Sequence, residues 1–192
     1  MPGSTPIYGF RWQELGDAPD GPDLGKNGFE DVEAEVARID GELDTAQADI
    51  VSLKTAACQL RQTVAQTIPN VAGRTIELDT VDVDTDGMAD LVNDRIVIQT
   101  PGTYLITATV AYTFDADGYR RAAVYVNGVN VYPMDARDAN SSNSLPTLPQ
   151  AQLVRNLVAG DLVTMQGLHT AGGDLLTNAA APYQSVLSAV KV

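Results

Sequence analysis

The residues best suited to chemistry form an acidic run at 82–90, with the sequence DVDTDGMAD. Carboxylates stand at places 1, 3, 5 and 9 of this run and glycine stands at place 6, as in the first nine places of a calcium-binding loop. The bidentate glutamate of place 12 is missing, because Asn93 stands there. The sequence therefore suggests no cofactor other than Ca²⁺. The alternative, which the alternation of Val81 and Val83 supports equally, is that two of the acids form the wet face of a strand. The four ligands under the calcium hypothesis are Asp82, Asp84, Asp86 and Asp90.

The usual catalytic arrangements are missing from the sequence. There is one histidine, His169, with no acid or nucleophile paired to it in sequence, so we expect it to serve at the surface or in packing. A single cysteine, Cys58, excludes a disulfide scaffold and a cysteine-based metal site. We therefore expect a binding protein and not an enzyme. The enzymatic alternative is an envelope-polysaccharide hydrolase with paired carboxylates, drawn from 82–90 or from Asp115 and Asp117.

A polar connection of some eighteen residues, 133–150, is a second candidate for ligand contact. Loops of this length in compact domains are usually either functional or disordered. The alternative is an ordinary solvated surface loop. The candidate contact residues are Asp135, Asp138, Asn140 and Asn143.

Composition narrows the classes of partner. The 192 residues carry a net charge of −13 at a pI near 4.2, and a surface of this sign repels nucleic acid. No apolar run reaches the roughly 18 residues of a membrane span, and we expect no secretory leader. The charge is uneven, with three basic and twelve acidic residues among 1–53 against nine and thirteen among 54–192. The chain thus divides into compositionally different parts.

A heptad pattern predicts a helical stalk over 29–68. Apolar residues recur at alternating spacings of three and four, the signature of a coiled coil. Asn27 and Glu30 suit a capping box at its start, and Pro69 marks its end. Cys58 falls at a position that points to solvent. The predicted core positions are Phe29, Val32, Val36, Ile39, Leu43, Ala46, Ile50, Leu53, Ala57, Leu60 and Val64.

A stalk of this length must associate with other copies. At 1.5 Å per residue it forms a rod of roughly 58 Å, whereas a globule of about 120 residues is about 35 Å across. Its own chain cannot cover the apolar stripe. The polar face is acidic, which excludes a membrane-surface helix. Glu35 and Asp40 would repel each other between chains, while Asp49 and Lys54 would attract, so the first half should be the looser one. The heptads alone leave the number of chains open.

The opening segment, 1–28, reads as an extended arm. The run DAPDGP at 17–22 is turn-forming, and we expect it to be non-helical. Three alternating aromatic residues would place their rings on one side of a strand, suited to docking in a groove of a larger partner. The alternative is a leader whose rings cover the stalk. The rings belong to Tyr8, Phe10 and Trp12.

From about residue 73 to 192 the period changes to two, which predicts an all-β sandwich. Asn127-Gly128 predicts a two-residue hairpin. Tyr104 and Tyr112 would share a strand face, either at a subunit boundary or in the core. The expected strands are 75–79, 95–98, 103–113, 122–126, 129–132, 151–156, 161–166 and 185–192.

Four motifs in this part resemble, in order, landmarks of the trimeric jelly roll shared by tumour necrosis factor and the globular heads of complement and collagen-like proteins. They are TPGTYLITA at 100–108, VYVNG at 124–128, LVAGDLVTM at 157–165 and VLSAV at 186–190. The resemblance covers roughly residues 75–192. It implies a jelly-roll head that trimerises about an axis parallel to the preceding stalk, which would make the stalk a parallel trimeric coiled coil.

The opening residues carry a second resemblance. IYGFRW at 7–12, DAPDGPDLG at 17–25 and the acidic helix that follows are similar to the start of minor tail or head-fibre proteins from tailed phages of actinobacteria. This implies a homotrimeric fibre on the virion surface, anchored to capsid or tail proteins by its N-terminus. Its head would bind host-surface polysaccharide or decorate the capsid, without contact to nucleic acid or insertion into a membrane.

Overall fold

The computed structural model describes residues 3–4, 11–12, 21–53, 55–139 and 145–192. The chain forms two compact units, Met1–Lys54 and Thr55–Val192. We call the second unit the head. Within the described residues, no helix is both long and apolar enough to cross a bilayer.

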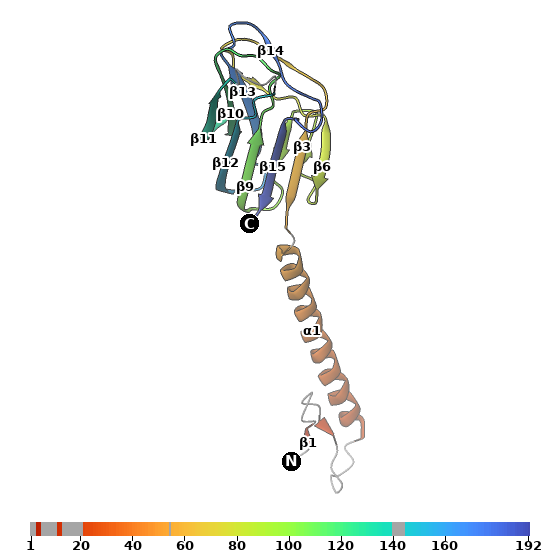
Figure 1. The fold of residues 1–192 in the computed structure, drawn as a ribbon. Coiled ribbons are helices and arrows are strands. Elements are labelled where there is room, and N and C mark those ends of the chain that lie inside the picture. Colours follow the sequence, from red (N-terminus) through yellow and green to blue (C-terminus); the bar gives the residue numbers. More distant parts are fainter. Residues whose placement is uncertain (1–2, 5–10, 13–20, 54, 140–144) are drawn as a thin grey trace. The chain divides into compact units, whose positions relative to one another are not determined.

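Among its described residues, the first unit contains one helix and one strand pair (Figure 1). The two short strands pair antiparallel, with Gly3 opposite Trp12. The helix begins at Gly21 and not at residue 29, so the prediction that 17–22 is entirely non-helical was wrong at its end. Pro22 fits there because a helix's first turn has no partner for its backbone N–H groups. The elements are β1 (Gly3–Ser4), β2 (Arg11–Trp12) and α1 (Gly21–Leu53).

The helix ends at Leu53, well before the predicted end at residue 68. Beyond it the buried residues alternate, at Ala56, Cys58, Leu60 and Gln62, and Ala57–Arg61 forms a strand of the head. Three predicted stalk-core residues therefore lie in the head: Ala57, Leu60 and Val64. The prediction failed because Leu60 fits both the heptad and the two-residue period of the strand, while Ala57 is apolar without being one of the strand's buried positions. The head consequently begins at Thr55 and not near residue 73.

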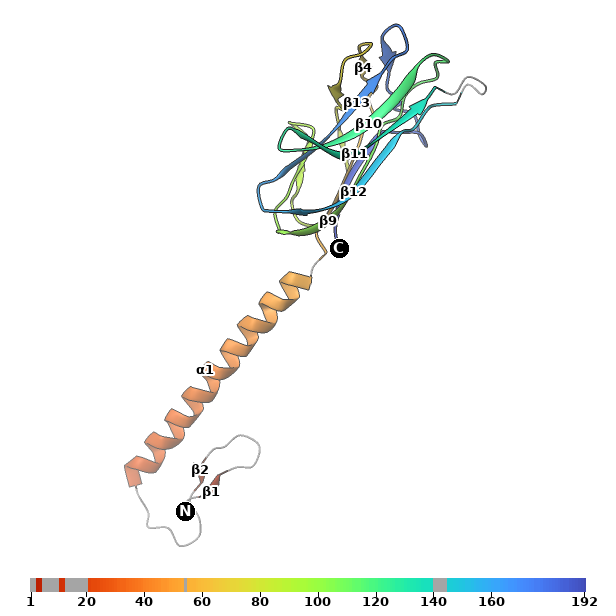
Figure 2. The ribbon, with the colours of Figure 1, turned by 90° about the vertical axis from the view of Figure 1, so that its left-hand side faces the viewer.

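The head is a mainly β sandwich of two packed sheets (Figure 2). One of these sheets has the order β12-β9-β15-β3-β6, and the other runs β11-β10-β13-β8-β7, with β5 also paired to β13. A separate small sheet pairs β14 with β4. The predicted jelly-roll sandwich is confirmed. The strands are β3 (Ala57–Arg61), β4 (Thr67–Ile68), β5 (Arg74–Thr75), β6 (Thr80–Asp84), β7 (Ala89–Asp90), β8 (Arg95–Val97), β9 (Gly102–Thr109), β10 (Tyr119–Val126), β11 (Val129–Asp138), β12 (Gln150–Leu157), β13 (Leu162–His169), β14 (Leu175–Leu176) and β15 (Val186–Lys191).

The core lies between the sheets and follows the two-residue period. Ile106 and Leu187 come from the first sheet and Val124 and Met165 from the second, and all four are fully buried. Strand alternation puts every second side chain on the core side. The Asn127-Gly128 hairpin is confirmed, since Val126 pairs with Val129 and both turn residues have positive φ.

Both tyrosines of the 103–113 segment lie in the core. The hydroxyl of Tyr104 donates to the carbonyl oxygen of Thr100 at 2.7 Å. The hydroxyl of Tyr112 lies 2.9 Å from the carbonyl oxygen of Arg121 and 3.2 Å from that of Leu168. Neither ring is exposed, so the core alternative holds.

Candidate interaction surfaces

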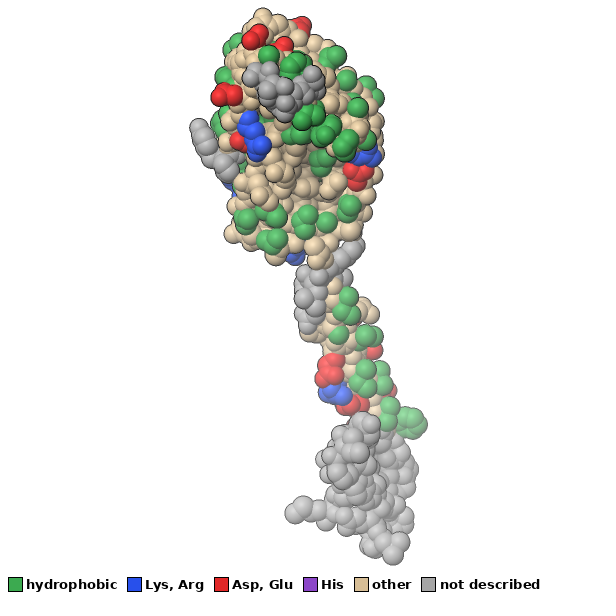
Figure 3. All heavy atoms as spheres, viewed as in Figure 1, with side chains coloured by type: hydrophobic (Ala, Val, Ile, Leu, Met, Phe, Trp, Pro, Cys, Tyr) green, Lys and Arg blue, Asp and Glu red, His purple; other side chains and the backbone are tan. Residues whose placement is uncertain are grey.

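The first candidate surface is an apolar stripe along α1, which the first unit leaves exposed (Figure 3). Its members stand at heptad spacing and are between 49% and 73% exposed. Single exposed apolar side chains are common on protein surfaces, but a continuous stripe of large ones is unusual on a monomeric protein. The helix therefore presents a seam suited to other helices. The stripe consists of Phe29, Val32, Val36, Ile39, Leu43 and Ile50, with the exposed Ala46 between the last two.

Acidic side chains flank this stripe. Arg38 is ion-paired with Glu35 and Glu42 of its own helix, one turn away on either side. The Nε of Arg38 lies 2.9 Å from Glu35, and this hydrogen bond lowers the pKa of the Glu35 carboxyl. Because Arg38 is occupied by two carboxylates of its own chain, the ion pairs on this part of the helix are local ones.

The second candidate surface is the outer face of the sheet β12-β9-β15-β3-β6. Register aligns its side chains in rows, for example Val154, Leu105, Val190 and Ala57 from strand to strand. Along the three central strands every outward position is uncharged except Arg61 (Figure 3). On a chain with a net charge of −13, a sheet face nearly free of charge suits contact with another protein surface. The outward residues of these strands are Thr103, Leu105, Thr107, Thr109, Val186, Ser188, Val190, Ala57, Gln59 and Arg61.

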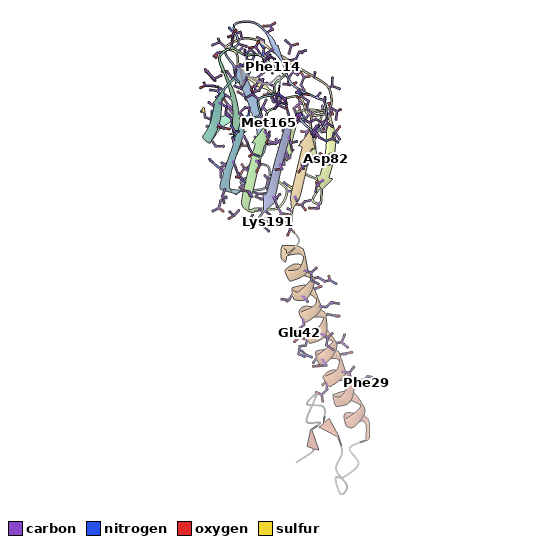
Figure 4. All side chains as sticks on the ribbon, viewed as in Figure 1. Phe29, Glu42, Asp82, Phe114, Met165 and Lys191 are labelled. Carbon is purple, nitrogen blue, oxygen red and sulfur yellow. The ribbon has the colours of Figure 1, made fainter. Side chains whose placement is uncertain are left out.

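The Arg61 charge is balanced at the edge of this face. Its Nε lies 2.9 Å from an Asp82 oxygen and its Nη2 lies 2.9 Å from the other, a bidentate ion pair. Figure 4 labels Asp82 beside the strands β3 and β6. The hydrogen bond from Arg61 is the main reason that the pKa of Asp82 is lowered. The ion pair leaves the outer face without net charge.

The structure does not bring the four predicted calcium ligands together. Asp82 is held by Arg61, whereas Asp84 accepts the backbone N–H groups of Met88 and Ala89 at 2.9 and 3.1 Å. Asp90 is ion-paired with Arg95 at 2.7 Å, and Asp86 lies between. In the described part of the chain no group of three or more His, Cys, Asp or Glu could hold a metal. Asp82 and Asp84 lie on the exposed strand β6, as the strand alternative expected, and calcium binding stays a prediction.

The predicted ligand loop is shorter than expected, because β11 continues to Asp138. Asp135 lies on this strand, where it accepts from Arg137 and from the backbone N–H of Gln150 at 2.8 Å. Asp138 pairs with Tyr119 in register. The other two predicted contacts, Asn140 and Asn143, lie outside the described residues. The loop prediction was therefore wrong for its first six residues. They form a strand, although their polar side chains are typical of a loop.

Two of the three docking-arm residues, Tyr8 and Phe10, also lie outside the described residues. Trp12 belongs to β2, so its backbone has the extended conformation expected there. The docking role of these residues stays a prediction.

A cluster of buried polar side chains lies among the loops at the end of the head that is opposite Thr55. Arg120 is fully buried, with its Nη2 3.1 Å from Asp115 and its guanidinium 6.0 Å from the centre of the Tyr112 ring. His169 is also fully buried; its Nε2 lies 2.7 Å from the carbonyl oxygen of Ile68 and its Nδ1 accepts the Ala171 N–H. Sequence reasoning expected packing or a surface position for His169, and the packing alternative holds.

Comparison with known structures identifies the sandwich. Similar chains include Eiger TNF from S. frugiperda, with a TM-score of 0.55 at 13% identity, over 72% of this chain and 92% of that one. The globular domain of zebrafish complement 1qA gives 0.52 at 13% identity, over 71% and 97%. Murine APRIL gives 0.55 at 15% identity, over 72% and 100%. The head is a TNF/C1q-like jelly roll. At these identities the similarity concerns the fold.

No protein-family model matches the chain, and no curated protein matches its sequence. Within the TNF/C1q-like head, sequence reasoning missed the uncharged sheet face and the buried Arg120–Asp115 pair. The alternation of Thr103, Leu105, Thr107 and Thr109 could have revealed the face. No sequence pattern indicates the buried pair, because Arg120 stands next to Arg121 and near several aspartates, and charged residues of this kind are normally expected at the surface.

Proposed function

We propose that this chain is a non-enzymatic homotrimeric fibre protein of a tailed-phage virion. The arm 1–20 docks on capsid or tail proteins, α1 forms a parallel coiled coil with its copies, and the jelly-roll head is presented for host-surface binding or capsid decoration. The observation that carries the proposal is the exposed heptad stripe from Phe29 to Ile50, in a chain whose other unit is a TNF/C1q-like head.

A further observation supports association between copies. The outer face of the sheet that contains β3, β9 and β15 has no net charge, in a chain that is otherwise strongly acidic. We take the number of copies to be three because the head resembles trimeric jelly rolls. Three heads on one fibre would also strengthen weak contacts with a repetitive surface polymer.

The attachment to a phage particle rests on the resemblance of residues 7–12 and 17–25 to the opening of minor tail and head-fibre proteins. Deleting residues 2–20 should leave soluble trimers that no longer join particles. Immunogold labelling of virions that carry the full chain should place the head on the capsid or on the tail. Full incorporation of the deleted chain would rule out the docking arm.

Several carboxylates of the head, three of them in the 82–90 run, differ from what the hydrolase alternative needs. A glycosidase general acid needs a raised pKa. Hydrogen bonds and ion pairs instead lower the pKa of Asp79, Asp82, Asp84, Asp90 and Asp161. Retention of the protein on host-envelope polysaccharide without new reducing ends is the expected result, and release of reducing ends would favour the hydrolase.

The stripe itself is tested by a matched pair of substitutions on α1. Leu43→Arg places a charge in the proposed seam, whereas Ala34→Arg places the same charge on an exposed position outside it. Light scattering should show loss or weakening of the trimer for Leu43→Arg only. Equal masses for both variants would contradict the coiled coil.

A further inference from the structure

A polar hollow in the head is separate from both candidate interaction surfaces. It is open to solvent and has a volume of about 510 Å³, within the range of small-molecule sites. It is formed by β4, by the segments on either side of that strand and by β5 with the residues after it. Its lining residues are Ala65, Gln66, Thr67, Pro69, Arg74 and Glu77.

Gln66 fixes the shape of this hollow. Its Nε2 donates to the carbonyl oxygen of Thr75 at 2.9 Å, and its Oε1 accepts the backbone N–H of Glu77 at 3.1 Å. Its backbone is held in turn by Thr177, whose Oγ1 lies 2.8 Å from the Gln66 nitrogen. The two walls of the hollow are thus tied together before any ligand arrives, which lowers the entropy cost of binding.

The charged groups at the hollow retain unused hydrogen-bonding capacity. In the described part of the chain Arg74 makes no ion pair or hydrogen bond through its guanidinium, whereas Arg61, Arg95, Arg120 and Arg137 are each paired with an aspartate. The Glu77 carboxylate receives one long contact, 3.4 Å from the Gln66 amide. The Arg74 guanidinium, a donor, and the Glu77 carboxylate, an acceptor, therefore line the same hollow without forming an ion pair with each other.

This combination selects among ligands. An anion would be attracted by Arg74 and repelled by Glu77, and a cation would experience the reverse. A neutral polyhydroxylated molecule suits both, since its hydroxyl groups can accept from a guanidinium and donate to a carboxylate. We propose that the hollow binds a neutral saccharide unit, with Arg74 as donor and Glu77 as acceptor.

This inference rests on the proposed role of the head at a host surface, and it names the class of polymer recognised there. Arg74 and Glu77 would make the specific contacts in each copy. Binding at one hollow would be weak, because Ala65 and Pro69 supply the apolar part of the lining and no aromatic ring lines it for stacking. Repetition over three heads would provide avidity.

The test uses the full chain on an array of neutral gluco-, galacto-, manno- and arabino-oligosaccharides, with uronic-acid-containing counterparts. The expected result is binding to at least one neutral series, weakened about tenfold or more by Arg74→Ala and by Glu77→Gln. The control is Arg155→Ala, which removes an exposed arginine outside the hollow and should leave binding unchanged. Thermal unfolding of each variant checks that the head is folded.

Binding to no neutral series, binding confined to uronic acids, or neutral binding that neither variant weakens would overturn the proposal. Light scattering on the same samples separates this failure from failure of the proposed function. Trimers without saccharide binding remove the hollow's role and leave the fibre intact, whereas monomers contradict the fibre itself.

Discussion

Arg120 and Asp115 join the start of β10 to the loop that precedes it, with the Arg120 Nη2 3.1 Å from the Asp115 Oδ1. The arginine is fully buried, while the side chain of Asp115 is one-third exposed. Three carbonyl oxygens also accept from the guanidinium: Asp117 O at 2.8 Å, Tyr119 O at 3.1 Å and Asp115 O at 3.2 Å. A charge buried at the end of the head is thus balanced by the loop folded around it.

We predict that Asp115→Asn destabilises the head by about 1.5–3 kcal/mol, because it leaves a buried guanidinium without its counter-ion. Urea unfolding followed by circular dichroism measures the change. Asp117→Asn is the matched control: it removes a neighbouring charge and keeps the carbonyl oxygen that Arg120 uses. Equal stability of the two variants would show that the ion pair contributes nothing.

Gly118 holds the same loop against the end of β13. Its φ is +68°, and a Cβ there would lie 1.9 Å from the carbonyl oxygen of Thr170. Gly172 has a similar φ of +86° but open space around it. We therefore expect Gly172→Ala to cost about 1–2 kcal/mol from its backbone conformation, and Gly118→Ala to cost about 1–3 kcal/mol more from the collision. Thermal unfolding of the two variants measures the difference. Equal losses of stability would contradict the predicted collision at residue 118.

Acid should destabilise the head through its aspartates. Burial alone would raise the pKa of Asp84, but the N–H groups of Met88 and Ala89 outweigh it, so the pKa is lowered. Arg61 lowers the pKa of Asp82, and Asn93 with Arg95 lowers that of Asp90. A carboxyl with a lower pKa in the folded state stabilises above its unfolded value of about 3.9, and this contribution is lost as pH falls through the folded value.

Unfolding free energy should therefore be nearly constant from pH 7 to 5 and fall below about pH 4. Urea titrations at stepped pH measure it. Asp84→Asn should be less stable at neutral pH and should show a shallower loss in acid. A variant with the wild-type acid slope would show that Asp84 is not among the responsible groups.

Cys58 should be unreactive in the folded protein. It is buried on β3, and burial, with a smaller effect of the Asp84 charge, raises the pKa of its thiol to about 12. Thiolate is the reactive species, so a disulfide reagent at pH 8 should label the chain only after denaturation. Rapid labelling of native protein would contradict this position and restore the solvent-facing position predicted from the heptad.

How far the sequence predicts the fold depends on the length of each pattern. The heptad from Phe29 to Ile50 and the long strands β9, β10 and β13 repeat their period often enough to be recognised. The strands β4, β5, β7 and β14 have two residues each and carry no period. The error at β3 is different: Leu60 fits both periods, and only the sheet partners of this strand decide between them.

The candidate sites were less predictable than the fold. The spacing from Asp82 to Asp90 resembles a calcium loop, but spacing does not reveal that Arg61 and Arg95 occupy two of the carboxylates. Arg61 stands 21 residues from Asp82, on a neighbouring strand. Partners supplied by distant segments decide whether an acid is available to a metal, and they become apparent only in the folded head.

The outer sheet face can be tested with one more matched pair. Thr107 and Thr164 are both half-buried threonines on outward positions, the first on the uncharged face and the second on the opposite sheet. Arginine at 107 should weaken the trimer by burying an unpaired charge between copies, whereas arginine at 164 should not. Sedimentation at several concentrations would show the difference, and a weaker trimer for Thr164→Arg alone would move the interface to the other sheet.

The central claim is that three copies associate through the helix stripe and the head. Sedimentation velocity of the full chain at micromolar concentration tests it most directly. The fibre account predicts a single species of three times 20.3 kDa. A species of 20.3 kDa that stays the same as concentration rises would contradict it.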